Sequence, residues 1–343
     1  MAYSNKPFII PIFMPHAGCP HQCVFCNQSS ITGVDSRRFT ISVSDHVEGF
    51  LTYKSGRRHF VQIAFFGGNF LGIKTDEIRR LLAEATEFVK VGRVSSIRFS
   101  TRPDTVDDRR LNMIKEFPVA TIELGVQSMD DRVLSATKRG HTAADTEKAI
   151  QCLKEFDYEI GLQIMVGLPG DTPERLRASA QRIVALKPDF IRIYPTLVLA
   201  GSPLAAWYKK GDYVPLSLKD AVTQVKELYR IFKNENIRVI RMGLQATEGL
   251  EKESTILAGP YHPAFGHLVY SQIFLDKATS ALKSVNPRGH GVVLHVHPQS
   301  VSQMRGLKND NIKKLRATLE LQSLEIVSDN SLKEDQLKVS VLI

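Results

Sequence analysis

Three cysteines lie close together near the start of the chain, at Cys19, Cys23 and Cys26. Three thiols cannot pair evenly as disulfides, and thiolates at this density bind zinc or an iron–sulfur cluster. A structural zinc ion needs four ligands, and His16 or His21 could supply the fourth. A cubane cluster held by three thiolates instead leaves one iron open for a substrate. The spacing therefore predicts a metal centre, and the residues alone leave both metals open.

Short β-rich runs alternate with helical patterns along most of the chain. The runs are 8–13, 60–66, 96–101, 120–127, 159–166, 190–194 and 237–242. Helix starts are indicated by Thr75 as a cap, by Pro173 in a first turn and by Ser217 in a capping pattern. Such repetition gives parallel strands joined by right-handed crossovers. The predicted fold class is α/β, a partial (β/α)6-type barrel resembling a TIM barrel, with the cysteine loop at the carboxyl end of the first strand.

Several predicted strands carry a polar face. Glu123 and Gln127 share one face of their strand, and Gln163 interrupts an otherwise apolar run. A closed barrel normally fills its interior with Val, Ile and Leu, and unpartnered buried polar groups cost roughly several kcal/mol each. We favour a polar ligand inside the barrel over a mutually satisfied buried network. Residues that either line the substrate side or simply pack are Arg192, Tyr194, Arg241 and Gln245.

The cysteine spacing, with Phe25 before the last cysteine, resembles the radical S-adenosylmethionine (SAM) superfamily. Further segments match that superfamily in the same order. They are Gly67-Gly68-Asn69, Ser100-Thr101-Arg102-Pro103-Asp104, Gly125-Val126-Gln127-Ser128, Arg139-Gly140-His141-Thr142 and Gly167-Leu168-Pro169-Gly170-Asp171. Together they resemble the barrels of the Elongator catalytic subunit and of oxygen-independent coproporphyrinogen oxidase-like proteins, over roughly residues 8–250.

The resemblance implies both cofactors and their contacts. The three thiolates would hold a 4Fe-4S cluster whose open iron chelates SAM. An electron from an external flavodoxin- or ferredoxin-type donor would cleave SAM to a 5′-deoxyadenosyl radical that abstracts hydrogen from a substrate. No catalytic side chain is assigned beyond the cofactor-binding positions. Those positions are Phe25, Gly67, Gly68, Asn69, Ser100, Gln127, Arg139 and Gln163.

Two departures shape the expected function. Ser100 and Gln163 stand where the coproporphyrinogen enzymes carry Glu and Asp, so hydrogen bonding is kept and charge is lost. The Elongator subunit carries an acetyltransferase domain, but the residues after 250 show no acetyl-CoA phosphate loop. We expect a radical SAM enzyme without that domain, acting on an RNA nucleoside. The alternatives are a small metabolite such as a tetrapyrrole, or a non-catalytic metal-binding protein.

The chain is predicted to divide into a barrel, 1–258, and a small α/β domain, 259–343. The second segment has a β-α-turn-α-β order that resembles the minimal KH motif, whose GXXG loop grips nucleic-acid backbone. Gly306 is followed three residues later by Asn309 rather than Gly, and Asn tolerates left-handed backbone. The alternative is a small cap with a solvated basic face. Basic residues at this turn are Arg305, Lys308, Lys313, Lys314 and Arg316.

Composition limits the remaining classes. The chain has 343 residues, 43% apolar and 24% charged, which excludes a disordered, collagenous or coiled-coil protein. Its net charge of +9 suits an anionic partner such as RNA, although a solvated basic surface gives the same count. No apolar run reaches the roughly 20 residues that span a bilayer, and the start lacks a signal-peptide pattern. We therefore expect a cytoplasmic protein with no membrane partner.

Overall fold

The fold is built around one curved sheet of seven parallel strands. The computed structural model describes residues 7–28, 42–53, 60–252 and 254–342, and the sheet order is β1-β2-β3-β4-β5-β6-β8. The strands are β1 (Phe8–Met14), β2 (Val61–Gly67), β3 (Ser96–Thr101), β4 (Val119–Gln127), β5 (Glu159–Val166), β6 (Phe190–Pro195) and β8 (Arg238–Met242). Each neighbouring pair is parallel. The predicted partial α/β barrel is confirmed.

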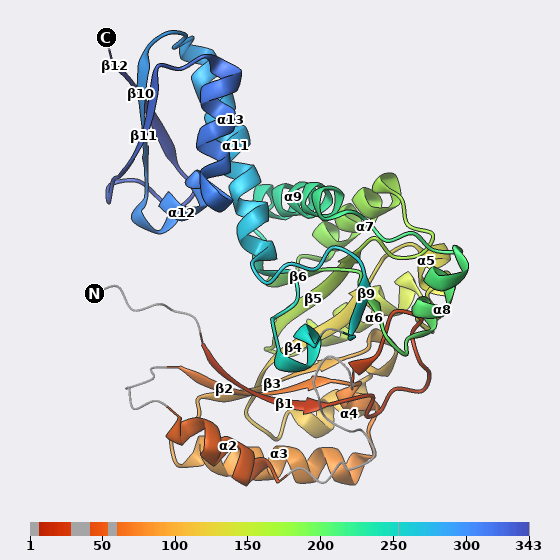
Figure 1. Cartoon of the computed structure of the whole chain (residues 1–343). Helices are drawn as coiled ribbons and strands as arrows, with labels where there is room; N and C mark the ends of the chain where they lie inside the picture. The colour runs from red at the N-terminus through yellow and green to blue at the C-terminus, as the bar shows by residue number, and fades with distance from the viewer. Residues whose placement is uncertain (1–6, 29–41, 54–59, 253, 343) are drawn as a thin grey trace.

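Helices connect these strands and cover the outer side of the curved sheet (Figure 1). They are α2 (Val43–Thr52), α3 (Thr75–Lys90), α4 (Asp108–Ile114), α5 (Asp131–Ala136), α6 (Ala143–Leu153), α7 (Pro173–Leu186), α8 (Pro203–Lys210) and α9 (Leu218–Asn234). Shorter elements are η2 (Phe70–Gly72), η3 (Pro103–Thr105), β7 (Val198–Leu199), α10 (Glu248–Glu251) and β9 (Ile256–Ala258). Because all seven strands are parallel, their carboxyl ends meet at one edge, and the loops leaving them form the mouth of the half-barrel.

The helix starts follow local capping chemistry in two of three predicted places. The Ser217 hydroxyl accepts a hydrogen bond from the Asp220 amide at 3.1 Å, and Thr172 caps α7 with Pro173 in its first turn. The predicted Thr75 cap is wrong, because α3 begins at Thr75 with Lys74 in the cap position and no side-chain cap. Acidic residues in the first turn of α3 offset its positive end instead.

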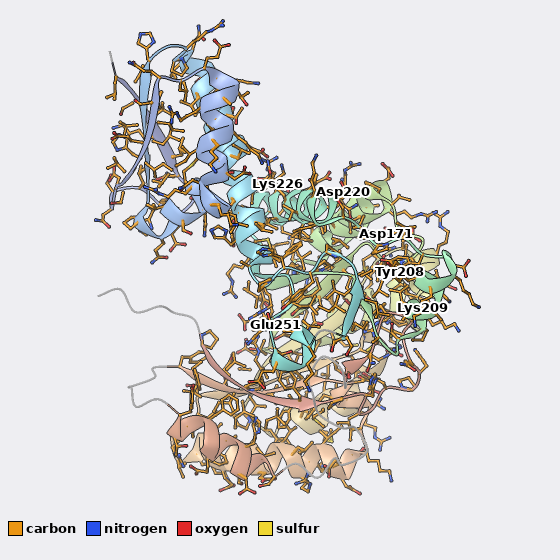
Figure 2. The ribbon with its side chains drawn as sticks, in the orientation of Figure 1. Asp171, Tyr208, Lys209, Asp220, Lys226 and Glu251 are labelled. Atoms are coloured by element: carbon orange, nitrogen blue, oxygen red, sulfur yellow. The ribbon has the colours of Figure 1, made fainter. Side chains whose placement is uncertain are left out.

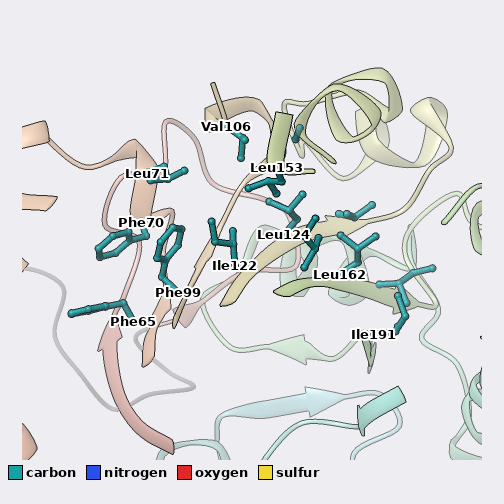
Figure 3. Packing of buried hydrophobic residues seen from close by; sticks show 14 of the residues in the cluster. Phe65, Phe70, Leu71, Phe99, Val106, Ile122, Leu124, Leu153, Leu162 and Ile191 are labelled. Carbon is teal, nitrogen blue, oxygen red and sulfur yellow. The ribbon is translucent and has the colours of Figure 1, made fainter. Parts of the chain in front are cut away.

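The outer face of the sheet forms the main hydrophobic core against the helices (Figure 3). Phe70 stacks between Phe65 and Phe99, with ring centroids 5.0 and 4.6 Å away. Ile122 and Leu124 on the central strand are fully buried. Because side chains alternate along a strand, burying this face turns Glu123 and its neighbours inward.

A second, smaller sheet lies at the carboxyl-terminal end of the chain (Figure 1). Its central strand β10 (Gly291–Val296) pairs parallel to β11 (Ser323–Ser328) and antiparallel to β12 (Leu337–Leu342), a strand the sequence did not indicate. Three helices accompany this sheet: α11 (Phe265–Val285), α12 (Val301–Arg305) and α13 (Asp310–Leu319), with the short turns η4 (Pro298–Ser300) and η5 (Leu307–Asn309). The order between β10 and β11 is therefore β-α-turn-α-β.

Helix α11 belongs to two cores at once. Its first half places Val269 and Ile273 in the core of the large sheet, whereas Ala278 and Leu282 pack in the core of the small one. The predicted division at residue 259 assigned the whole helix to the second unit. The structure instead joins the two cores through one continuous helix, because both of its halves present apolar side chains.

The turn between α12 and α13 has a left-handed backbone at several positions. Gly306 has φ 71°, Lys308 φ 52° and Asn309 φ 61°. The buried Asn311 side chain fixes this turn by donating to the carbonyls of Ser271 and Met304, at 2.8 and 3.1 Å. Asn309 thus takes the conformation that the sequence allows for it. Among the described residues, no helix is both long and apolar enough to cross a membrane.

Candidate functional site

The cysteine loop leaves the end of β1 and folds back onto the end of β2. The amides of Ala17 and Gly68 both donate to the Met14 carbonyl, at 3.2 and 2.8 Å, and the Asn69 amide donates to the Ala17 carbonyl at 2.6 Å. Further along the loop, the Val24 amide donates to the Thr137 carbonyl at 3.1 Å. The loop that carries the thiols is therefore held by two neighbouring connections at the mouth.

Two glycines are required by this close packing. A Cβ on Gly68 would collide with the backbone of Ala17, and a Cβ on Gly18 would collide with the Asn69 carbonyl. Gly18 also has φ 70°, which L side chains rarely adopt. The predicted cofactor glycine Gly68 thus has a structural reason within the protein, because it lets β2 approach the cysteine loop.

Asn69, also predicted at the cofactor, connects three strand ends through its buried side chain. Its Oδ1 accepts from the Thr101 hydroxyl at 2.7 Å and from the Arg102 amide at 3.0 Å. Its Nδ2 donates to the Gly18 carbonyl at 3.0 Å. The side chain is thereby engaged in positioning the cysteine loop against the end of β3.

Arg139 reaches from the loop after α5 to the thiols. Its Nη1 donates to the Cys23 sulfur at 3.3 Å, and its Nη2 donates to the Gly125 carbonyl at 2.5 Å. A Cβ on Gly125 would press against this guanidinium, so glycine is needed where the arginine crosses β4. The His21 ring bonds the Arg139 carbonyl at 2.9 Å and lies over Gly140.

Gln127 ends β4 in an unusual conformation. Its φ is 70°, and the pairing of β4 with β5 shifts register between Gly125 and Gln127. A bulge of this kind re-aims a side chain at the end of a strand. Several buried polar atoms near it lack a hydrogen-bond partner, and such atoms indicate space for a polar ligand. They are Gln127 Oε1, Arg139 Nε, Arg102 Nη1 and both ring nitrogens of His141.

Two of the three thiols, Cys19 and Cys26, sit in an environment that raises their pKa and favours their protonated forms. Burial and the charges of Cys23 and Cys19 raise the pKa of Cys26 to about 12. Burial also raises the pKa of Cys19, although the Arg139 charge opposes the shift. Within the described ranges, no three His, Cys, Asp or Glu side chains are arranged closely enough to form a metal site. The donor set nevertheless fits an iron–sulfur cluster, because three soft ligands share one loop and influence one another's charge.

The two histidines weighed as a fourth zinc ligand are engaged elsewhere. His21 bonds the Arg139 carbonyl, and His16 Nε2 accepts from the Gln28 amide at 3.2 Å. Cys152, on α6, is half-buried against the main core, as the sequence indicates. Each of these histidines thus has one ring nitrogen in a hydrogen bond, as a metal-bound histidine ordinarily does, and the zinc alternative stays a prediction.

The lower interior of the half-barrel holds a buried ionic network. Glu123 is fully buried and lies 2.7 Å from Arg192 and 3.2 Å from Arg98. Gln163 Nε2 contacts both Glu123, at 3.3 Å, and the Ser100 hydroxyl, at 3.4 Å. At this level Glu123 and Gln163 are hydrogen-bonded within the interior, whereas Arg98 Nε and Arg192 Nε make no hydrogen bond in the described part of the chain. The network alternative therefore describes most of the floor of the interior, and further unpartnered atoms near Gln127 lie at the carboxyl end above it.

Helix α8 closes one side of the mouth beside Phe25. The Leu204 amide donates to the Val24 carbonyl at 2.8 Å, and Phe25 packs with Leu204 and Trp207. Phe25 is thus anchored by a helix far from it in sequence. Sequence reasoning did not find this contact, because nothing local to residues 203–210 points to the cysteine loop.

Arg102 and His141 are site residues that the sequence did not single out individually. Arg102 is 2% exposed, pairs through two bonds of 2.9 Å with Asp104, and keeps one unpartnered nitrogen. Burial, aided by the charges of Arg139 and Arg102, lowers the pKa of His141 to about 3. Both lie in segments that resemble the superfamily, 100–104 and 139–142. Their burial is visible only in the structure.

Family comparisons agree with this geometry. The family described as "Radical SAM superfamily" matches residues 14–183, and the "Radical_SAM C-terminal domain" matches residues 188–274. The second match ends in the middle of α11, where that helix passes from one core to the other. The small sheet lies beyond both matches.

Individual relatives point the same way. A tRNA uridine(34) acetyltransferase of Methanocaldococcus jannaschii is 30% identical over 59% of this chain and 37% of its own length. Elongator complex protein 3 of Schizosaccharomyces pombe is 28% identical over 48% of this chain and 33% of its own. The chain thus spans well under half of these two relatives. The solved archaeal Methanocaldococcus infernus Elp3 shares the fold, with a TM-score of 0.61 and 22% identity over 79% of this chain and 63% of that one.

Proposed function

Because the chain belongs to the radical SAM superfamily, we propose that Cys19, Cys23 and Cys26 hold a 4Fe-4S cluster. Members of this family are enzymes that use the cluster to cleave SAM, and here the resulting 5′-deoxyadenosyl radical would abstract hydrogen from an RNA nucleoside. The observation that carries the proposal is the placement of three thiols on one loop, beside a patch of buried polar atoms that lack partners. An external flavodoxin- or ferredoxin-type protein would supply the electron.

The residues around the thiols would bind and orient SAM. Gln127 and Arg102 offer unpartnered polar atoms, an acceptor and a donor respectively. Gly67 lies against the Met14 backbone at the end of β1, and Phe25, within the loop, packs against a buried cluster that includes Leu204 of α8. Arg139 would steady the site by donating to the Cys23 sulfur while its Nε stays available. Ser100 on β3 and Gln163 on β5 would contribute hydrogen bonds from the interior of the half-barrel, below its mouth.

Gln127→Ala tests this SAM site without touching the cluster ligands. We expect weaker SAM binding by equilibrium dialysis and an unchanged iron content, because the variant loses one unpartnered acceptor and no thiol. If iron content and SAM affinity fall together, Gln127 is structural and this part of the proposal is wrong. Ser128→Ala is the matched control, because its hydroxyl bonds within the protein, to the Asp130 amide at 3.1 Å.

RNA as the substrate class is supported by the charge and chemistry of the mouth. Helix α8, which is bonded to the cysteine loop, ends in exposed Lys209 and Lys210, and neither forms an ion pair within the described residues. Tyr208, beside them, is 38% exposed (Figure 2). Basic groups that contact phosphates, with an exposed ring on which a base stacks, are typical of single-stranded nucleic-acid binding.

The small domain would add a second RNA contact. We keep the division into a barrel, 1–258, and an α/β domain, 259–343, as part of the proposal. Its support is the β-α-turn-α-β order and the left-handed turn that exposes Lys308. A KH-like contact would grip the RNA backbone at this turn.

Two double variants separate these contacts. Lys209→Glu with Lys210→Glu should weaken RNA retention and lower its salt dependence by about two phosphate contacts. Each contact contributes roughly 0.7 to the slope of log affinity against log salt concentration for a single strand. Gly306→Asp with Lys308→Glu should abolish the contact of the small domain. Lys90→Glu, on the outer helix α3, is the control. If neither double variant differs from the control, RNA is removed as the substrate and a small metabolite remains.

A further inference from the structure

The inner face of the half-barrel carries more positive than negative charge. Among the described residues, Glu123 is the carboxylate at the middle of the inner face, halfway along β4. Both Arg98 and Arg192 pair with it. Nearer the amino ends, Glu159 is matched by Arg238 at 2.6 Å. Each carboxylate on this face is thus already in contact with at least one arginine.

Arg241 adds a further cation to this face. Strand pairing places Gln163, Arg192 and Arg241 in one row across β5, β6 and β8. Residues in register on neighbouring strands project to the same side of a sheet. The pairing of β6 with β8 shifts register just before this row, but in the next pair Ile193 and Met242 are both buried in the main core. Arg241 precedes Met242 on the strand and therefore projects to the opposite, inner side. Its side chain is half-buried and forms no ion pair or hydrogen bond with the described residues.

This placement is unfavourable without a further anion. Neighbouring strands lie about 4.8 Å apart, and like charges directly opposite one another destabilise a sheet. Glu123 is shared between Arg98 and Arg192, so it leaves Arg241 uncompensated. Two residues further toward the mouth along β6, Tyr194 places its hydroxyl 3.5 Å from Arg192 Nη1. Two guanidinium groups and a phenol therefore border the same part of the interior.

We propose that Arg241, with Arg192 and Tyr194, binds an anionic group of the substrate inside the half-barrel. Phosphate and carboxylate share the required chemistry, since either accepts paired hydrogen bonds from a guanidinium. The site lies in the row of Gln163, which pairs with Gly125 on β4, two residues before Gln127 at the end of that strand, where SAM is proposed to bind. The inference rests on the proposed function and narrows its substrate to a molecule with an anionic group near the reacting carbon.

Anion binding to the holoprotein tests the inference. The anaerobic protein, loaded with SAM and without reductant, is titrated calorimetrically with sodium phosphate and separately with sodium acetate at constant ionic strength. We expect saturable binding of at least one anion by the wild type, at least tenfold weaker binding by Arg241→Gln, and partial recovery in Arg241→Lys. Lys219→Gln, which removes an exposed cation on α9 that has no ion pair among the described residues, should bind as the wild type does.

Each result of these titrations either supports or overturns the inference. Preferred phosphate binding supports the site with a phosphorylated substrate such as a nucleotide, and preferred acetate binding supports it with a carboxylate. Equal affinities in Arg241→Gln and the wild type overturn the inference, as does an equal loss in Lys219→Gln. Iron content and circular dichroism exclude misfolding of the variants. If the wild type cleaves SAM but binds neither anion, this inference fails and the proposed function stands.

Discussion

Glu123 is the position where one substitution should cost the most stability. Its carboxylate is fully buried and contacts Arg192 at 2.7 and 3.0 Å, Arg98 at 3.2 Å and Gln163 at 3.3 Å. Glu123→Gln keeps the shape, removes the charge and leaves two buried guanidinium groups without their counter-ion. Removing one partner of a buried pair costs about 3–5 kcal/mol, so we expect a loss of that size in the free energy of unfolding.

Urea unfolding of the iron-free protein measures this loss. The matched control is Glu116→Gln, which breaks the exposed pair with Arg79 at 3.2 Å and should cost less than about 1 kcal/mol. Combining Glu123→Gln with Arg192→Leu should cost less than the sum of the two single changes, because the second change removes one uncompensated cation. If Glu123→Gln costs no more than the control, Glu123 does not neutralise the interior.

Three further outcomes follow from other buried groups. Because burial lowers the pKa of His141 to about 3, the folded state binds fewer protons than the unfolded state between pH 3 and 6.5. The free energy of unfolding should therefore decrease as the pH is lowered from 6.5 to 3. His141→Gln should flatten this dependence, measured as the urea midpoint at each pH. Burial raises the pKa of Asp171 to about 6, so its ionisation opposes folding; Asp171→Asn should raise the melting temperature at pH 8 and not at pH 3.5. Gly68→Ala should prevent iron incorporation by displacing the cysteine loop, whereas Gly49→Ala, in open space on α2, should leave the iron content unchanged.

Local signals were enough to predict the barrel. Strands 96–101 and 159–166 were predicted with the bounds the structure has, because each is an uninterrupted β-rich run between turn residues. The cap at Ser217 needed only its own sequence neighbours. The Thr75 cap failed because a threonine one position inside a helix has the same sequence signature as a threonine that precedes it. The strand β12 was missed although its first five residues alternate apolar and polar side chains, which is the pattern of a half-buried strand.

The candidate ligands could be named from the sequence, whereas most of the contacts that support them could not. Three closely spaced cysteines indicate a metal in any fold, so proposing Cys19, Cys23 and Cys26 as ligands needed no structure. The roles of Asn69 and α8 depend on contacts between segments at least thirty residues apart, which no local pattern encodes. Polar strand faces were visible in the sequence. Only the register across strands shows that Arg192 belongs to the ionic network at Glu123, whereas Arg241, opposite Arg192, has no carboxylate partner among the described residues.

The most direct measurement of the central claim is SAM cleavage by the anaerobically reconstituted protein. The wild type should be brown, carry about four irons per chain and release 5′-deoxyadenosine when reduced with dithionite. Cys23→Ala should lose the intact cluster and all cleavage, while Cys152→Ala, which changes a thiol on α6 outside the loop, should behave as the wild type does. A colourless protein with one zinc ion, or full cleavage by Cys23→Ala, would contradict the account.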